Sequence, residues 1–491
     1  MNSFRIKSTD IKNNIFIPKY YDPEIENELL RLSNNHNLIK IGTLLQNGVL
    51  SISTGDEIGK MAYGTGDIPF VRTSDISNWE IKTIPKQGVS QEIFEYYNEK
   101  QDIQENDILF VKDGTYLIGT NCLVSKLDLP MLYQSHIYKV RVNENELITP
   151  HLLFLLLNTE IVQKQIRSFQ FTADIIDTIG NRFLEIVLPI PKNNKEALDT
   201  SFQVQQMLTD RVKYKAVIKQ FPLLMEESLR NGGTDNFSEF LSKDLDEILE
   251  EMIQDTVTLE FGDFSTFSIR SSEIKNSIFI PKYYDPSIYD ELHDLEKNCE
   301  LRTIGELTKS GILSLSTGDE IGKMAYGTGN IPFLRTSDFS NWEIKTDVKQ
   351  GISEEIYDLY KEKEDVQSED ILLVRDGTYL VGSSCMITQY DSKSLFSGGL
   401  YKIRTNDSSY LSSYLLLGLL NSYIVKRQIR TKQFTRDVID TIGKRLDEVL
   451  LPIPKSNQMK KVISQQVEDI VQKRIEAREN IFSSAVDLTN F

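Results

Sequence analysis

Three short motifs rich in basic, hydroxyl, aromatic and glycine residues each occur twice in this chain. They are STGDEIGKMAYGTG at Ser53 and Ser316, RTSD at Arg72 and Arg335, and DGTYL after a basic residue at Lys112 and Arg375. Lysine, arginine and hydroxyl side chains bind phosphates, and arginine can bind guanine through two hydrogen bonds. Glycine lets a backbone approach a ligand closely. These residue types favour nucleic-acid binding.

The candidate DNA contacts are the basic, hydroxyl and tyrosine residues of these motifs. They are Lys60, Tyr63, Arg72, Thr73, Ser74, Lys112 and Tyr116 in the first copy, and Lys323, Tyr326, Arg335, Thr336, Ser337, Arg375 and Tyr379 in the second. Each motif also has a purely structural interpretation. The glycine-rich run could be a hairpin loop, the Arg and Asp of RTSD could satisfy each other at a strand end, and Asp-Gly is a common hairpin turn.

Catalytic motifs are scarce in the sequence. The Asp/Asn-Pro-Pro-aromatic tetrapeptide of amino-methyltransferases and the phosphate loop of ATPases do not occur. A metal-dependent nuclease could use Glu80 and Lys82, which recur as Glu343 and Lys345, but the upstream acid Asp67 becomes Asn in the second copy. We therefore expect no catalytic residues, no metal and no cofactor in this chain.

The motifs belong to a tandem repeat with an unbroken register. IFIPKYYDP begins at Ile15 and Ile278, NWEIKT at Asn78 and Asn341, and LPIPK at Leu188 and Leu451, so each pair is 263 residues apart. A period of this length indicates duplicated domains. None of the four histidines is shared by both copies, which excludes a duplicated histidine-based active site; they are His36, His136, His151 and His293, opposite Cys299, Gly399, Tyr414 and Leu30.

Short β-rich runs alternate with helical segments inside each copy. IPFVRTSDI, DILFV, TYLIGTNCLV and IYKVRV are typical of strands, whereas 151–167 is predicted to be helical. We expect two similar mixed modules of an α+β fold, separated by long helices. The predicted boundaries are 1–192 for the first module, 193–230 for a helix, 231–266 for an acidic connector, 267–455 for the second module and 456–491 for a second helix.

The helix after each module has an apolar stripe that could bind a partner. Its residues are Met207, Leu208 and Val212 in the first helix, and Val467, Ile470, Val471 and Ile475 in the second. The connector holds ten acidic residues and one lysine between 231 and 263, within a chain of net charge −17. We predict one acidic helix there, SEFLSKDLDEILEEMIQ, capped by Ser238.

The three cysteines lack the spacing of a zinc site or a disulfide framework. No apolar run is long enough for a transmembrane helix, and the first residues lack the apolar segment of a secretory signal. We therefore expect a cytoplasmic protein with no membrane partner.

The order of the motifs resembles the DNA specificity subunits of Type I restriction-modification systems. The resemblance rests on the glycine-rich run, IPFVRTSDI, DILFVKDGTYLIG, FTADIIDTIGNRFLEIVLPIPK and the following helix, and it covers nearly the whole chain twice. It implies two target-recognition domains and antiparallel spacer helices. It also implies binding to double-stranded DNA and to methyltransferase subunits, two being expected, which carry S-adenosylmethionine; a restriction or translocase subunit would be a further partner.

Two similar modules in opposite orientation should bind similar half-sites in inverted order, so we expect a bipartite, near-palindromic target. Two other hypotheses remain open. The chain could be an interaction scaffold that does not bind DNA, which its acidity favours, or the metal-dependent nuclease described above.

Overall fold

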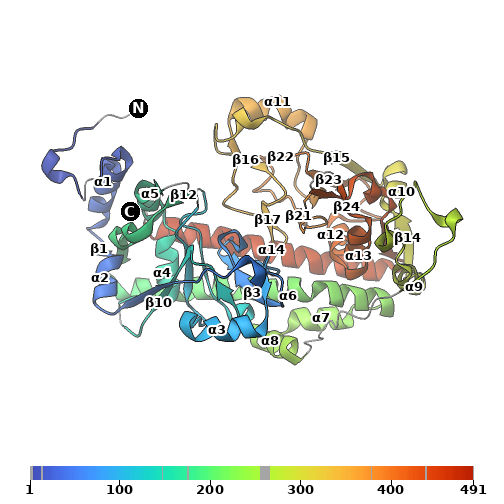
Figure 1. Cartoon of the computed structure of the whole chain (residues 1–491), viewed down its shortest axis with the longest axis horizontal. Helices are drawn as coiled ribbons and strands as arrows, with labels where there is room; N and C mark the ends of the chain where they lie inside the picture. Colours follow the sequence, from blue (N-terminus) through green and yellow to red (C-terminus); the bar gives the residue numbers. More distant parts are fainter. Residues whose placement is uncertain are drawn as a thin grey trace. The chain divides into compact units, whose positions relative to one another are not determined.

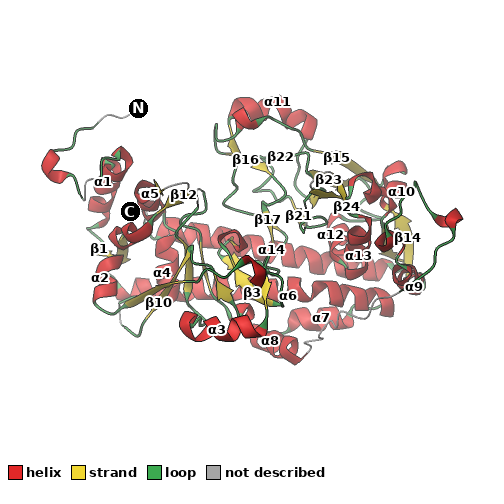
Figure 2. Cartoon of the chain, in the orientation of Figure 1, coloured by secondary structure: helices red, strands yellow, loops and turns green. Residues whose placement is uncertain are grey.

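The computed structural model describes residues 4–12, 15–114, 116–145, 147–173, 176–254, 266–377, 379–436 and 439–489. Figure 1 labels the helices and strands, and Figure 2 colours them by type. The chain divides into two compact units, one made of Met1–Val212 and Arg474–Phe491 and the other of Lys213–Lys473. Each unit thus combines one module with parts of both long helices.

The first unit holds the elements of the first module. Its strands are β1 (His36–Lys40), β2 (Leu50–Thr54), β3 (Ile68–Val71), β4 (Ile76–Ser77), β5 (Glu80–Ile81), β6 (Gly88–Val89), β7 (Ile108–Val111), β8 (Asn121–Leu123), β9 (Leu132–Tyr133), β10 (Ile137–Val142), β11 (Phe171–Ala173), β12 (Ile176–Thr178) and β13 (Val187–Pro191). Its helices are α1 (Pro23–Leu32), α2 (Ile41–Gln46), α3 (Gln91–Gln101), α4 (Pro150–Leu157) and α5 (Glu160–Phe169).

The second unit repeats this series. Its strands are β14 (Cys299–Thr303), β15 (Leu313–Thr317), β16 (Ile331–Leu334), β17 (Phe339–Ser340), β18 (Glu343–Ile344), β19 (Gly351–Ile352), β20 (Ile371–Val374), β21 (Ser384–Met386), β22 (Leu395–Phe396), β23 (Leu400–Thr405), β24 (Phe434–Arg436), β25 (Ile439–Thr441) and β26 (Leu450–Pro454). Its helices are α9 (Pro286–Leu295), α10 (Ile304–Lys309), α11 (Glu354–Glu364), α12 (Ser413–Asn421) and α13 (Tyr423–Lys432), together with α7 (Asp235–Ser242) and α8 (Leu245–Gln254) of the connector.

The sheet order is the same in both modules. The first has a four-stranded antiparallel sheet β2-β10-β7-β8 and a three-stranded sheet β6-β3-β9 in which β3 and β9 are parallel. The second has β15-β23-β20-β21 and β19-β16-β22. Apolar side chains of β7 and β20 are buried on both faces, as expected for central strands covered by helices and loops.

Two long helices follow the modules: α6 (Asn194–Asn231) and α14 (Asn457–Asp487). At one end of unit 1, the His36 Nε2 atom lies 3.0 Å from the Leu488 carbonyl oxygen, and β1 pairs with β13, which directly precedes α6. At the other end, Arg211 Nη1 donates to the Arg474 carbonyl at 3.2 Å, and Arg474 Nη1 donates to the Arg211 carbonyl at 3.5 Å. The helices therefore run antiparallel within unit 1.

The α+β fold with two similar modules and long helices is confirmed, whereas one local prediction is wrong. The segment 151–167 is helical as predicted, and it is divided into α4 and α5 at Asn158 and Thr159. The connector was predicted to be one helix but is two, because the chain is extended at Lys243, and Thr234 rather than Ser238 occupies the N-cap position of α7. Three of the ten acidic residues, Asp255, Glu260 and Asp263, lie outside the described residues.

Among the residues that the structure describes, every helix is either too short or too polar to cross a bilayer.

Candidate nucleic-acid interface

The glycine-rich run does not form a hairpin loop. It leaves β2 in one sheet and enters β3 in another, so it crosses between the two sheets. A Cβ atom at Gly55 would lie 2.2 Å from the Tyr133 carbonyl oxygen, and one at Gly318 would lie 1.9 Å from the Phe396 carbonyl oxygen. Only glycine fits here, because the loop packs directly against β9 or β22.

The outer part of this loop carries an exposed cation and an exposed thioether. A short 3-10 helix, Lys60–Ala62, leaves Lys60 exposed and Met61 92 % exposed; Met324 in the second copy is 93 % exposed. The methionine was not among the predicted contacts, because a single apolar residue in a polar loop has no periodic pattern. Its identity in both copies is the signal that could have found it.

Tyr63 connects the glycine-rich loop to the RTSD motif. Its ring packs on Phe70 of β3 at a centroid distance of 5.7 Å, and the Arg72 guanidinium lies 5.9 Å from the Tyr63 ring centroid. A guanidinium over an aromatic face is held by cation–π attraction. Two predicted contacts, Tyr63 and Arg72, are therefore adjacent, and the tyrosine is half-buried.

The aspartate of RTSD holds the backbone of its own turn. The Asp75 carboxylate is fully buried and accepts hydrogen bonds from the backbone N–H of Arg72 at 3.0 Å and of Lys86 at 3.4 Å. Asp338 likewise accepts from Arg335 N–H at 2.8 Å, and burial raises the pKa of its carboxyl group. The carboxylate thus shapes a 3-10 turn, Thr73–Asp75, that presents the flanking hydroxyl and guanidinium groups.

Asp-Gly in the DGTYL motif is not the turn of a tight hairpin. The Gly114 N–H donates to the Asp177 carbonyl at 2.9 Å, and Ile179 N–H donates to the Lys112 carbonyl at 3.0 Å. Gly377 and Ile442 make the same contacts with Asp440 and Arg375. DGTYL therefore pairs with the DTIG segment 64 residues further along, in both modules.

The basic residue of this motif is partly engaged inside its own module. The Lys112 ammonium lies 5.1 Å from the Tyr138 ring centroid and 3.5 Å from Asp113, whereas Arg375 donates to the Gly398 carbonyl at 3.1 Å. Tyr116 is half-buried against the core, and Tyr379 is 41 % exposed. The two copies thus differ in how far this motif is available to a ligand.

The Glu80 carboxylate belongs to an ion-pair cluster. Asn78 and Trp79 have φ values of 51° and 63°, the conformation of a two-residue type I′ turn, and they join β4 to β5. This turn places Glu80, which is 6 % exposed, 2.5 Å from Arg474 Nη2 and 3.5 Å from Arg211 Nη2.

The tryptophan of this turn, and Trp342 of the equivalent turn in the second module, pack on the long helices. The Trp79 ring contacts Phe482 of α14, with centroids 4.8 Å apart, and in the second unit Trp342 contacts Phe221 of α6 at 4.7 Å. NWEIKT therefore attaches each module to the helix that follows the other module. This position removes the basis for a nuclease centred on Glu80, since its carboxylate is committed to two guanidinium groups. No group of three or more potential metal-ligating side chains occurs among the described residues.

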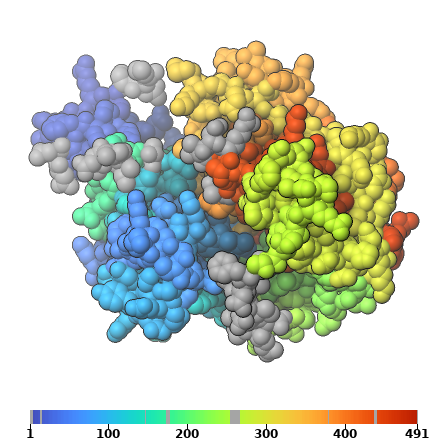
Figure 3. Space-filling model, turned by 45° about the vertical axis from the view of Figure 1, so that its right-hand side comes forward, coloured from blue at the N-terminus to red at the C-terminus, as the bar shows by residue number. Residues whose placement is uncertain are grey.

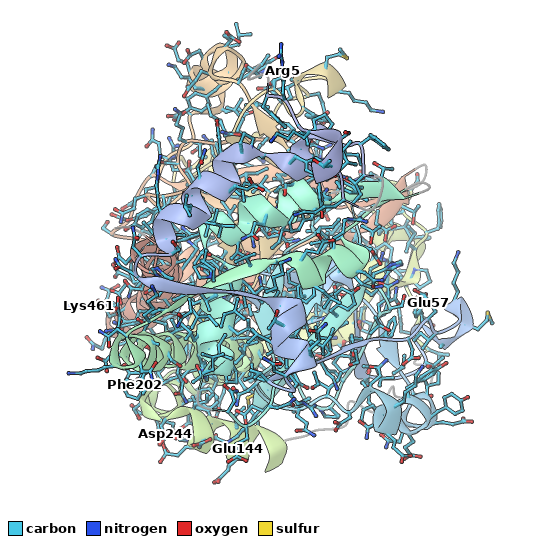
Figure 4. All side chains as sticks on the ribbon, turned by 90° about the vertical axis from the view of Figure 1, so that its left-hand side faces the viewer. Arg5, Glu57, Glu144, Phe202, Asp244 and Lys461 are labelled. Atoms are coloured by element: carbon cyan, nitrogen blue, oxygen red, sulfur yellow. The ribbon has the colours of Figure 1, made fainter. Side chains whose placement is uncertain are left out.

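The predicted partner-binding stripe packs within the chain. Leu208 and Met207 belong to the core of the first module, and Gly418 of α12 lies against Val467. Ile470, Val471 and Ile475 are buried, and Val212 is half-buried. Phe202, 59 % exposed, lies on the outer face of α6 (Figure 4). A docking surface must therefore use other residues than the stripe.

Residues 46–213 match the model of the Type I restriction modification DNA specificity domain. No curated protein matches the chain. Among solved structures, the Type I restriction-modification system S subunit from M. genitalium aligns over 93 % of this chain and 95 % of its own, with 13 % identity and a TM-score of 0.32. The HsdS subunit from Thermoanaerobacter tengcongensis aligns over 94 % and 92 %, with 14 % identity and a TM-score of 0.27. The family model thus confirms the resemblance expected from the sequence over residues 46–213.

Proposed function

We propose that the whole chain is a non-catalytic DNA specificity subunit with two DNA-binding modules, starting from the match of residues 46–213 to the model of the Type I restriction modification DNA specificity domain. One observation carries the proposal. The glycine-rich loop, RTSD and DGTYL are brought together in the first module, and the same hydrogen bonds and close approaches recur in the second. A duplicated site with the same geometry fits two half-sites of one DNA duplex.

Base contacts are assigned to the residues that project from this site. Arg72, Arg335 and the hydroxyl groups next to them are the candidates for base edges, and Lys60 and Lys323 for phosphates. Met61 and Met324 extend from the same loop and suit apolar contact with bases. Antiparallel helices and a repeat with one register support inverted half-sites, and hence a near-palindromic bipartite target.

Methyltransferase subunits are the proposed protein partners, with a restriction or translocase subunit as a further partner. The sequence IFIPKYYDP offers an apolar surface in each module: Phe16 is 74 % exposed and Phe279 is 75 % exposed. Figure 3 shows the second segment, in lime, on the surface of its unit. A surface present twice suits a partner that binds in two copies.

Selection of DNA from a random library tests the DNA-binding proposal. The full chain, reconstituted with a methyltransferase subunit of this family, should enrich double-stranded fragments that share two short sequences. The double variant Lys60→Ala, Lys323→Ala should weaken retention of all sequences and reduce its salt dependence, since phosphate contacts carry no sequence information. Absence of any enriched sequence at every salt concentration would favour the scaffold hypothesis instead.

Partner docking has its own test. Phe16→Ser should leave one methyltransferase subunit bound, and Phe16→Ser with Phe279→Ser should leave none, as measured by native mass spectrometry. The exposed Tyr96 of α3 provides the control, because Tyr96→Ser should retain both subunits. Equal stoichiometry in the double variant and the unmodified chain would contradict docking at IFIPKYYDP.

A further inference from the structure

The three motifs surround a pair of residues that differs between the modules. Ser135-His136 directly precedes β10 in the first module, and Gly398-Gly399 precedes the equivalent strand β23 in the second. Three motif residues around the pair are the same in both modules: Glu57 corresponds to Glu320, Thr73 to Thr336 and Asp113 to Asp376, whereas Lys112 corresponds to Arg375. The variable pair therefore lies within a largely shared frame.

In the first module the imidazole of His136 is held between two carboxylates. Its Nδ1 atom lies 2.9 Å from Asp113 Oδ2, and its Nε2 atom lies 3.6 Å from Glu57 Oε1. Ser135 Oγ donates a hydrogen bond to the same Glu57 carboxylate. Glu57 is on the glycine-rich loop (Figure 4), and Asp113 is in DGTYL. The His136 side chain is 37 % exposed, so the oriented ring is accessible to a ligand.

In the second module backbone replaces these side chains. A Cβ atom at Gly399 would lie 2.9 Å from Thr336 Cγ2, and one at Gly398 would lie 3.1 Å from Glu320 Oε1. The Gly399 carbonyl accepts hydrogen bonds from Arg375 N–H at 2.9 Å and Asp376 N–H at 3.2 Å. The backbone thus occupies the same place between the same motifs, but it offers no side chain there.

We propose that His136 is a specificity-determining residue, which binds a base edge in the half-site of the first module, and that the second module does not discriminate bases at the equivalent position. The inference rests on the proposed DNA-binding function. Because the frame is largely shared, shared residues give the two half-sites their common bases. The imidazole has Nδ1 fixed by Asp113, and Nε2, whose contact with Glu57 is longer at 3.6 Å, would hydrogen-bond a base edge in the groove. The target is therefore a palindrome broken at the position that His136 contacts.

The variant Ser135→Gly, His136→Gly gives the first module the glycine pair of the second, a backbone that this fold already accepts. In the library selection with the full chain and its methyltransferase partner, one position of one half-site should lose discrimination. The loss should be about 5- to 150-fold, the range for one specific base contact. All other positions should be unchanged. His293→Ala removes a histidine of α9 that is 83 % exposed and should leave the selected sequence as it was.

A second variant tests the orientation of the ring. Asp113→Asn keeps the imidazole but weakens its hydrogen bond, and it should reduce discrimination at the same base position by a smaller factor. A double-glycine variant that selects the same sequence as the unmodified chain would overturn the inference while leaving the proposed function intact. An unmodified chain that selects no sequence would overturn both.

Discussion

Gln101 of the first module and Glu364 of the second end equivalent helices, α3 and α11, and both are buried. The Gln101 amide donates to Asp56 at 3.0 Å and accepts from Tyr133 N–H at 2.9 Å. Glu364 accepts from Asp319 N–H at 3.1 Å and from Phe396 N–H at 2.8 Å. One position thus supports the same loop through a neutral amide in one module and an ionisable group in the other.

Two further pairs of equivalent positions also differ in side chain: His136 corresponds to Gly399, and His36 corresponds to Cys299. In each case the backbone positions agree and the side chain chemistry differs. The duplication therefore preserved the geometry that places the proposed DNA-binding loops, while single residues inside that geometry diverged. Four predictions test how far the two modules are equivalent, from the largest expected effect to the smallest.

Glu80→Ala should destabilise the first unit by about 3–5 kcal/mol, because it removes a carboxylate that pairs with the buried Arg474 and Arg211. Glu343 is equally buried, and Glu343→Ala should cost a similar amount if the repeat preserves the cluster. Denaturant unfolding measures both. The control is Glu99→Ala on the exposed face of α3, which should change the free energy of unfolding by less than about 0.5 kcal/mol. If Glu80→Ala lowered the free energy of unfolding by no more than this control, the ion pairs would have no structural role.

Burial raises the pKa of Glu364 to about 7. The folded chain therefore keeps a proton that the unfolded chain releases near its ordinary pKa of about 4.5. The stability that this group contributes is present at low pH and is lost as the pH rises from about 4.5 through about 7, by up to about 3 kcal/mol. Glu364→Gln should remove this loss.

The melting temperature as a function of pH measures this effect. The gain of Glu364→Gln over the unmodified chain should be larger at pH 8 than at pH 5. Gln101→Glu is the reciprocal variant and should introduce a similar loss in the first unit. A gain of Glu364→Gln that is the same at both pH values would show that its ionisation does not matter.

Arg72→Ala should weaken specific DNA binding by about 1–3 kcal/mol and relax one base position in one half-site, the value for a good arginine contact. Arg335→Ala should relax the equivalent position in the other half-site. Competition binding with single-base variants of the target shows which half-site each substitution affects. If both variants relaxed the same half-site, the assignment of one half-site to each module would be wrong.

His36→Cys should destabilise the first unit by about 1 kcal/mol, the value for one hydrogen bond. His36 Nε2 is 3.0 Å from the Leu488 carbonyl, whereas Cys299 Sγ is 3.9 Å from the Leu229 carbonyl, so the second module already has the weaker contact. Hydrogen exchange at the C-terminal turn of α14 should increase in the variant. Unchanged exchange there would show that the imidazole does not anchor the helix.

The repeat, the strand-like runs and the long helices could be predicted from the sequence because they depend on register and periodicity. The role of Glu80 could not, since its partner Arg474 is 394 residues away and no spacing rule connects them. Asp113-Gly114 has the local pattern of a tight turn, but pairing with Asp177 and Thr178 overrides it. Where a long-range contact decides the conformation, local chemistry alone predicts the wrong element.

The methylome of cells that carry this chain and its methyltransferase tests the central claim most directly. Sequencing of modified adenines should reveal a bipartite target whose two halves are inverted and closely related, differing at one position. Two unrelated half-sites, or two related half-sites in the same orientation, would contradict an account in which the duplicated modules bind DNA as inverted equivalents.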